Sequence, residues 1–335
     1  MYFKFDKTDI TIVVVYVDDV LFMGSNPKLV KKEKGNFMKV WESRDLGKAK
    51  EYLGMCITRD HKNRTLTLDQ CVYVEKVLKR FGMQNAKPAR TLLPTGYNPK
   101  VSEIKATSVL RSQYQSVIGS LLYIMLGTRP DIAFAVIHMS QFCANPSQEH
   151  LSRALYIVRY LGSTKNLALC FDGANHDGFL GYTDSDWAAN PDDWKSITGY
   201  VLFLANSPVS WLTRRQKTVA LSSTEAEYMA MSDTTRQISW IKSLLGEIHF
   251  SIPKVPLYCD NQGAIFLATN PAQEQRSKHI GIRYHYIQEC VKEGDKIDLF
   301  YIPTGEQIAD IFTKNLSPVK FKDICKGLRM ISYSS

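Results

Sequence analysis

The sequence lacks several features that would place it in a special class. It has no signal-peptide pattern over Met1 to Lys7 and no apolar run long enough to cross a bilayer. Its seven cysteines are an odd number without a Cys-x-x-Cys pair, so we expect reduced thiols and neither a disulfide framework nor a zinc site. It also has no long polar tract of the kind that stays disordered. We expect a folded intracellular protein, cytoplasmic or nuclear, with no membrane partner.

The composition is that of a globular and mildly basic chain. Its 335 residues suffice for two or three domains, each with its own core. The hydrophobic fraction is 44%, and the formal net charge is +9. Basic chains that also cluster carboxylates are typical of enzymes acting on nucleic acid, because Lys and Arg bind phosphates while acids bind metal. A solvated basic surface would explain the charge equally well.

The most informative stretch is Gly181–Ala188, with the sequence GYTDSDWA, which lies between two apolar runs that read as strands. An Asp-Ser-Asp alone would suit a turn. Three later segments, however, each place one acid at the end of a strand or on a helix: Glu227, Asp260 and Asp310. Acids delivered from distant elements, with Asp184 at their centre, predict a pocket for divalent metal.

Local sequence patterns distinguish Asp184 and Glu227 from two nearby acids, Asp186 and Glu225. Ser222 and Glu225 fit a capping box at the start of a long helix, so Glu225 has a structural role available. Glu227 lies roughly 200° further round that helix and must point elsewhere. Asp186 shares a strand face with Asp184 and is an outer ligand, or a direct one if the register differs. Glu225 is the corresponding competitor of Glu227.

The first part of the chain reads as strands and helices. Residues 10–23 predict a hairpin with Asp18 and Asp19 at its tip; two adjacent carboxylates buried there would need a cation, whereas a plain two-residue turn would not. An amphipathic helix is expected over 28–43, a strand with a tight bend over 51–57, another strand over 65–68 and a helix over 70–81.

The middle of the chain changes character. Residues 84–110 lack periodicity and predict a long surface linker. Helices are expected over about 111–126, 130–143 and 147–162. They would form a packed bundle whose bases contact phosphate or simply face solvent: Arg129, Arg153, Arg159 and Lys165.

Several motifs resemble those of a known family. Tyr16-Val17-Asp18-Asp19 in an apolar hairpin resembles the catalytic signature of reverse transcriptases, whose third Asp lies on an earlier strand. Fifteen residues precede Tyr16, so we expect an incomplete polymerase site and no DNA synthesis by this chain alone. The later order, three strands, helix, strand, two helices, strand and helix, resembles ribonuclease H.

The joint pattern resembles the C-terminal part of the Pol polyprotein of copia-type LTR retrotransposons. The matching pieces are YTDSDWA (182–188), SSTEAEY (222–228), CDNQ (259–262), KHIGIRYH (278–285) and DIFTKNL (310–316). The resemblance implies an α/β (α+β) fold with a ribonuclease H-like, mixed five-stranded sheet. The implied parts are a partial palm with the first thumb helix (1–83), a linker (84–110), a helical thumb or connection (111–172), a ribonuclease H-like domain (173–318) and a C-terminal tail (319–335).

The resemblance also implies a site and an activity. Asp184, Glu227, Asp260 and Asp310 would bind two Mg²⁺ ions, with Mn²⁺ as a possible substitute, and cleave RNA in RNA/DNA hybrids. Asp18 and Asp19 would be the remnant of a polymerase site that a missing N-terminal portion completes. A virus-like particle in the cytoplasm, or the nucleus, would be the location. Candidate contacts to the hybrid are Arg214, Arg215, Lys217, Arg276, Lys278 and Arg283. The alternative is a degenerate, inactive remnant that binds nucleic acid; the oligomeric state stays open.

Overall fold

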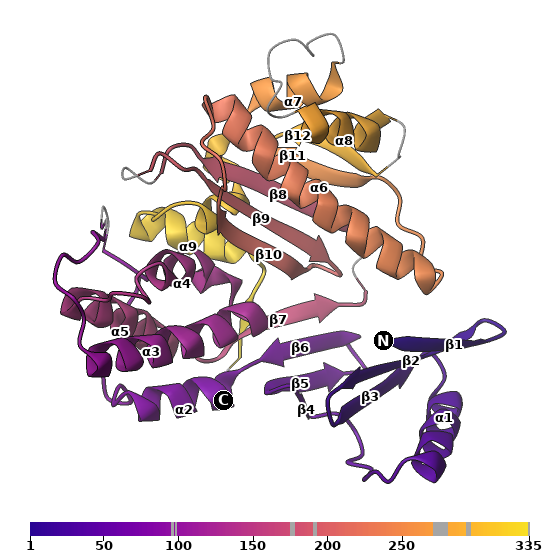
Figure 1. Ribbon diagram of the computed structural model, residues 1–335. Helices are drawn as coiled ribbons and strands as arrows, with labels where there is room; N and C mark the ends of the chain where they lie inside the picture. Colours follow the sequence, from indigo (N-terminus) through magenta and orange to yellow (C-terminus); the bar gives the residue numbers. More distant parts are fainter. Residues whose placement is uncertain are drawn as a thin grey trace.

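The computed structural model describes residues 1–94, 97, 99–174, 178–189, 193–270, 281–292 and 296–333, which form three sheets flanked by helices (Figure 1). The expected α/β (α+β) class and the mixed five-stranded C-terminal sheet are confirmed. Among the described residues, no helix combines the length and the apolar character needed to cross a membrane.

The first sheet is antiparallel, in the order β1 (Tyr2–Asp6), β2 (Asp9–Tyr16), β3 (Asp19–Gly24), and α1 (Pro27–Val40) packs against it. Asp18 and Asp19 lie at the predicted hairpin tip, where Val17 has a φ of 52°. Both acids are exposed, so water solvates their charges. The prediction that they are buried between apolar strands is wrong, and no cation is needed to compensate them.

The second sheet combines distant parts of the chain. Its order is β13-β7-β6-β5-β4, with antiparallel neighbours throughout. The strands are β4 (Glu51–Tyr52), β5 (Met55–Asp60), β6 (Thr65–Asp69), β7 (Leu167–Asp172) and β13 (Ile331–Ser332). Gly54, with a φ of 69°, turns the chain between β4 and β5, so the strand expected over 51–57 is a hairpin. The helix α2 (Cys71–Arg80) follows β6.

The predicted helical bundle is present. It contains α3 (Ser108–Gly127), the 3₁₀ turn η1 (Pro130–Ile132), α4 (Ala133–Ser140) and α5 (Gln148–Ser163). Arg129 is only 1% exposed and donates from Nε and a terminal nitrogen to the Asp131 carboxylate at 2.8 and 2.7 Å. Arg129 therefore belongs to the core of the bundle, and the suggestion that it contacts phosphate is wrong.

The segment 84–110 is not a surface linker. Ala89, Leu92 and Leu93 are buried and pack into the core of the bundle. A segment whose apolar residues are buried one by one shows no regular period, which is why its sequence resembled a solvent-exposed loop.

The third sheet carries the candidate site. Its order is β10-β9-β8-β11-β12, antiparallel from β10 to β8 and parallel from β8 to β12. The strands are β8 (Phe179–Asp186), β9 (Ile197–Leu204), β10 (Ser207–Arg215), β11 (Val255–Cys259) and β12 (Ile297–Tyr301). Three helices pack together on one face: α6 (Ser223–Glu247), α7 (Gln262–Thr269) and α8 (Gly281–Lys292).

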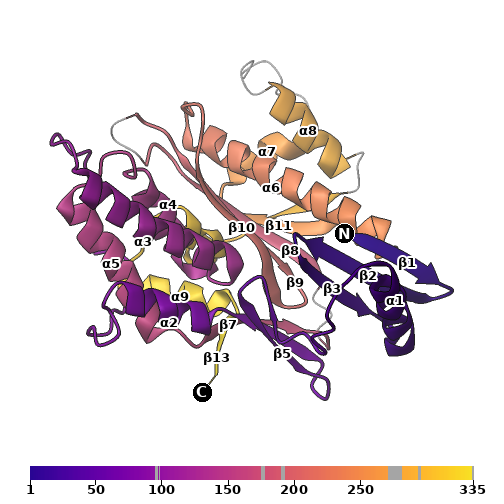
Figure 2. The ribbon, with the colours of Figure 1, turned by 60° about the horizontal axis from the view of Figure 1, so that its bottom comes forward.

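The opposite face of this sheet packs on the bundle, as Figure 2 shows. Tyr200 and Leu202 of β9 point to the core under α6, whereas Val201 and Phe203 join the core of the bundle. This alternation follows from the two-residue period of a strand. The helix α9 (Pro318–Gly327) adds Phe321 and Ile324 to the bundle core, and β13 pairs with β7.

Candidate active site

The central strand β8 supplies two acids. Asp184 is 1% exposed, and Asp186 lies half-buried on the same strand face near its end. Burial raises the pKa of Asp184 to about 7; Lys314 opposes this shift, and Asp310 adds to it. Burial also raises the pKa of Asp186. The strand β8 has a paired strand on each side, so its carboxylates are shielded from water. Their negative charge therefore needs a nearby cation to stabilise it.

The helix α6 supplies the third acid. Ser222 Oγ accepts from Glu225 N at 3.1 Å, while Glu225 Oε2 accepts from Leu221 N at 2.8 Å. Glu225 therefore caps the helix, although it bonds the residue before Ser222 and not Ser222 itself. Glu227 is 5% exposed, and its Oε1 accepts from Ser185 N on β8 at 3.1 Å.

The end of β11 brings Asp260 to Glu227. Carboxylate oxygens of Glu227 and Asp260 and the Cys259 sulfur lie within 4.8 Å of one another. Burial raises the pKa of Glu227 well above its ordinary range, and the negative charges of Asp184 and Asp260 add to the effect. Asn261 then caps α7 by accepting from Ala264 N at 2.9 Å, which fixes the chain immediately after Asp260.

Asp310 comes from the short 3₁₀ helix η5 (Ile308–Phe312), which stands where the last helix of the expected order lies. It is fully buried. The helix η5 can lie close to β9 because Gly199 has no side chain: a Cβ there would sit 2.7 Å from Phe312 Cβ. Gln307 Nε2 also donates to Thr183 O at 3.0 Å, which ties this turn to β8.

Lys314 and Lys320 compensate the negative charge of these acids. Neither lysine was identified from the sequence. Lys314 Nζ lies 2.8 Å from Asp310 Oδ1 and 3.6 Å from Asp184 Oδ2. Lys320 of α9 forms an ion pair with Asp310 Oδ2, and Thr313 Oγ1 donates to Asp184 Oδ2. Although burial opposes its charge, the carboxylates raise the pKa of Lys314. The available signal was the four-residue spacing between Asp310 and Lys314.

The arrangement has two sides. Glu227 and Asp260 form one, whereas Asp184 and Asp310 share the Lys314 ammonium on the other. Carboxylate oxygens are the ligands that Mg²⁺ prefers, and at Asp184 and Glu227 burial disfavours the negative charge unless a cation compensates it. The donor set of these four residues therefore fits divalent metal, with the ammonium group of Lys314 standing where positive charge is needed.

The other candidate residues are not part of this carboxylate cluster, or they lie outside the residues that the structure describes. Asp18 and Asp19 belong to the separate β1-β2-β3 sheet. Arg214 is ion-paired with Asp233, Arg215 Nη1 lies 3.0 Å from Asp193 Oδ2, and Lys217 is exposed. The remaining bases lie outside the residues whose side chains are described: Arg276, Lys278 and Arg283.

Known proteins resemble this chain over most of its length. Residues 1–95 match the family described as reverse transcriptase (RNA-dependent DNA polymerase). The chain is 41% identical to the "Retrovirus-related Pol polyprotein from transposon TNT 1-94" of Nicotiana tabacum, over 98% of this chain and 25% of that protein. It is 30% identical to the "Putative transposon Ty5-1 protein YCL074W" of Saccharomyces cerevisiae, over 71% of this chain and 77% of that protein. The chain belongs to the copia-type retrotransposon Pol family.

This Pol chain spans 25% of the length of the tobacco polyprotein. Among solved structures, it resembles LC11-RNase H1, isolated from compost, with 13% identity and a TM-score of 0.33. That likeness covers 45% of this chain and 99% of the solved one.

Proposed function

We propose that this chain is a ribonuclease H that cleaves the RNA strand of RNA/DNA hybrids with divalent metal. The observation that carries the proposal is the convergence of Asp184, Glu227, Asp260 and Asp310 from β8, α6, the end of β11 and η5. Metal-dependent hydrolysis of phosphodiesters needs such a set of carboxylates around the scissile phosphate.

The two sides of the site support a division of roles. Asp184 would be shared between two Mg²⁺ ions, with Glu227 and Asp260 on the leaving-group side and Asp310 on the side of the attacking water. When bound, the ions supply a water of lowered pKa and neutralise the charge that develops on the phosphate. Mn²⁺ would substitute, because it also prefers oxygen ligands.

The chain's own groups orient these acids. Ser185 N donates to Glu227 and Thr313 Oγ1 donates to Asp184, so both carboxylates are held in one orientation before metal binds. Preorganised ligands of this kind avoid reorganisation during the reaction. Asp186, half-buried beside Asp184, would act through a water molecule in the outer shell.

The chain would recognise the shape of the hybrid's backbone. Arg214, Arg215 and Lys217 stand at the end of β10 and just beyond it, and Arg214 and Arg215 are each ion-paired with an acid. Phosphates would exchange with those acids, while 2′-hydroxyls would mark the RNA strand. Arg276, Lys278 and Arg283 are proposed for the same role from the sequence alone.

The test is cleavage of a labelled RNA/DNA hybrid by the full chain. We expect cleavage with Mg²⁺, none after chelation by EDTA, and recovery when Mg²⁺ is restored. Asp184→Asn, Asp260→Asn and Glu227→Gln should reduce cleavage to background. Glu225→Gln is the matched control, because Glu225 bonds Leu221 N at the start of α6 and should leave cleavage intact.

Two outcomes would contradict the proposal. Cleavage that persists undiminished in Asp184→Asn and Asp260→Asn would point to a contaminating nuclease. Metal-independent binding of the hybrid without any cleavage would favour the inactive remnant instead.

Primer extension in the same preparation would test the separate expectation that Asp18 and Asp19 do not support DNA synthesis in this chain.

A further inference from the structure

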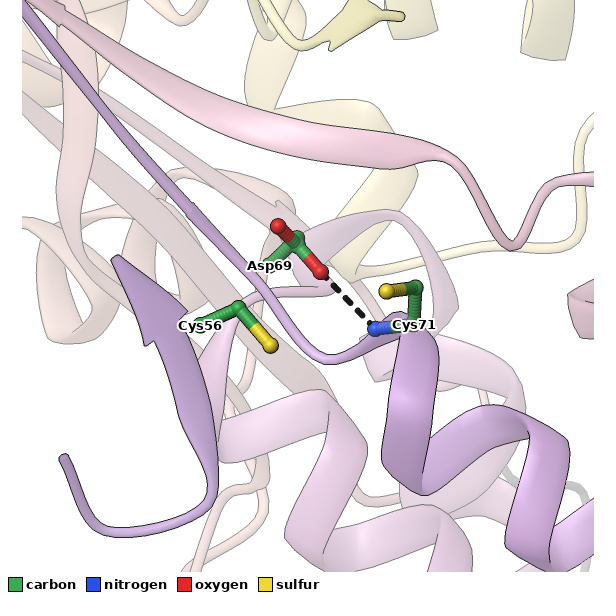
Figure 3. A group of neighbouring side chains, drawn as sticks. All are labelled: Cys56, Asp69 and Cys71. Carbon is green, nitrogen blue, oxygen red and sulfur yellow. Dashed lines mark hydrogen bonds between the residues drawn. The ribbon is translucent and has the colours of Figure 1, made fainter. Parts of the chain in front are cut away.

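A second group of metal-ligating side chains lies far from the carboxylates, in the β13-β7-β6-β5-β4 sheet. Cys56 on β5 stands directly opposite Asp69 on β6, and Cys71 is the first residue of α2. One ligand atom from each of these three side chains lies within 4.8 Å of the others. Figure 3 shows the three side chains gathered around the turn that joins β6 to α2.

The backbone holds these groups in place. Asp69 is 3% exposed, and its Oδ1 accepts from Cys71 N at 2.9 Å. The Gln70 side chain does not cap the helix, so Asp69 is the side chain that bonds the first N–H group of α2. Both cysteines are half-buried, which leaves a route for an incoming ion.

The composition of the cluster suits a cation. The buried Asp69 carboxylate stands beside both sulfurs, and a divalent cation bound there would neutralise its charge and displace the thiol protons. Lys165 is held by Glu75 at 2.7 Å.

A third segment closes the cluster. Tyr333, which follows β13, contacts Asp69 and Cys71 through its hydroxyl group. The cluster therefore joins the β5–β6 hairpin and the start of α2, which follow one another in the sequence, to the distant C-terminal segment.

We propose that Cys56, Asp69 and Cys71 bind one divalent cation of the zinc class, with a water molecule in the fourth position. Two thiolates and one carboxylate are ligands that Zn²⁺ accepts in tetrahedral geometry, with Zn–S near 2.3 Å and Zn–O near 2.0 Å. Ligand atoms in such a site are about 4 Å apart, so small side-chain rotations suffice. The ion would link the β5–β6 hairpin to the start of α2, independently of the proposed ribonuclease H activity.

The sequence concealed this site. The cysteines are not in a Cys-x-x-Cys pair, and that absence led to the expectation of no zinc site. The ligands meet because β5 and β6 pair in a register that sets Cys56 against Asp69. Pairing register depends on the hairpin as a whole and cannot be read from cysteine spacing.

The test is titration of the reduced, EDTA-treated full chain with Co²⁺, which reports thiolate ligands through its charge-transfer absorption. Excess Mg²⁺ is present to fill the carboxylate site. We expect one equivalent of Co²⁺ with a thiolate band, displaced by one equivalent of Zn²⁺. Cys56→Ser and Cys71→Ser should lose the band, and Asp69→Asn should weaken Zn²⁺ binding by roughly tenfold or more.

Two matched thiol variants locate the signal. Cys170→Ser removes a half-buried thiol on the neighbouring strand β7 and should leave the band unchanged. Cys259→Ser removes the thiol beside Glu227 and Asp260 and should also leave it unchanged. Circular dichroism of each variant shows whether it is folded, and Zn²⁺ should raise the melting temperature of the wild type but not of Cys56→Ser.

Three results would overturn the proposal. One is the lack of a thiolate band in the folded wild type. Another is a band that survives in Cys56→Ser and Cys71→Ser or disappears in Cys259→Ser. The last is a Cys56–Cys71 disulfide that forms on mild oxidation of a chain that takes up no Zn²⁺ when reduced, which would make the pair a redox site.

Discussion

Lys314 stands between the acids that the proposed metal would use. Its ammonium lies 2.8 Å from Asp310 and 3.6 Å from Asp184, so a cation entering there must displace it. We expect Lys314→Gln to lower the Mg²⁺ concentration needed for half-maximal hybrid cleavage, because two cations at this distance repel each other. Lys322→Gln, which removes an exposed charge from α9, is the control. An unchanged or higher Mg²⁺ requirement in Lys314→Gln would show that the ammonium does not compete with metal.

Asp184 should make the stability of the metal-free chain depend on pH. Its pKa rises from 3.8 to about 7 on folding because the carboxyl is buried, so the folded state binds the proton more tightly than the unfolded state. This contribution to stability is complete below about pH 4 and is lost as the pH rises through about 7. The loss is on the order of 4 kcal/mol.

The measurement is urea denaturation in EDTA across this pH range, comparing wild type with Asp184→Asn. The amide cannot ionise, so the variant should lose less stability as the pH rises, and Mg²⁺ should restore wild-type stability at neutral pH. Equal pH dependence in both proteins would mean that Asp184 titrates normally in the folded chain.

At the scale of elements, the sequence predicts what local patterns encode. The alternation of β8 and β9 and the Ser222 cap of α6 placed Asp184 and Glu227 correctly on their elements. A helix carrying Asp310 was predicted, but its 3₁₀ form and the buried segment around Leu92 and Leu93 were missed, because tertiary contacts and not local periodicity determine them. Lys320, which pairs with Asp310 from α9, was missed for the same reason, whereas the four-residue spacing of Lys314 from Asp310 was a local signal.

The close packing of η5 on β9 depends on Gly199. A Cβ at this position would meet Thr313 Cγ2 at 2.6 Å, Phe312 Cβ at 2.7 Å and Ala309 O at 3.2 Å, so η5 would have to move. Gly199→Ala should therefore displace Asp310 and reduce hybrid cleavage by roughly a hundredfold, since about 1 Å of misplacement can cost that much.

Gly246→Ala is the matched control, because a Cβ at Gly246 meets no atom within 4 Å. In the helix α6 it should leave cleavage unchanged and slightly stabilise the chain. Full activity in folded Gly199→Ala would show that η5 can shift without moving Asp310 from its working position.

At the scale of the whole molecule, one core joins parts that the sequence assigned to different domains. Val201 and Phe203 of β9 and Phe312 of η5 pack with residues of α3, α4 and α5. Most of the helix α9 and all of the strand β13 fall in the segment 319–335, and both contact the earlier parts of the chain. Periodicity showed which strand faces are apolar, but it did not show which helices cover them.

This shared core predicts that residues 173–318 do not fold stably alone. The isolated segment would expose Val201, Phe203, Ile311 and Phe312, each at most 2% exposed in the full chain. Each such side chain contributes about 1.5–3 kcal/mol when buried, so their sum is comparable to the stability of a typical domain. We expect the segment to bind hydrophobic dyes, to lack near-ultraviolet circular dichroism and to unfold without a cooperative transition, whereas the full chain unfolds cooperatively. A cooperative transition of the segment near that of the full chain would show that the ribonuclease H-like part is an autonomous domain despite the apolar face it shares with the bundle.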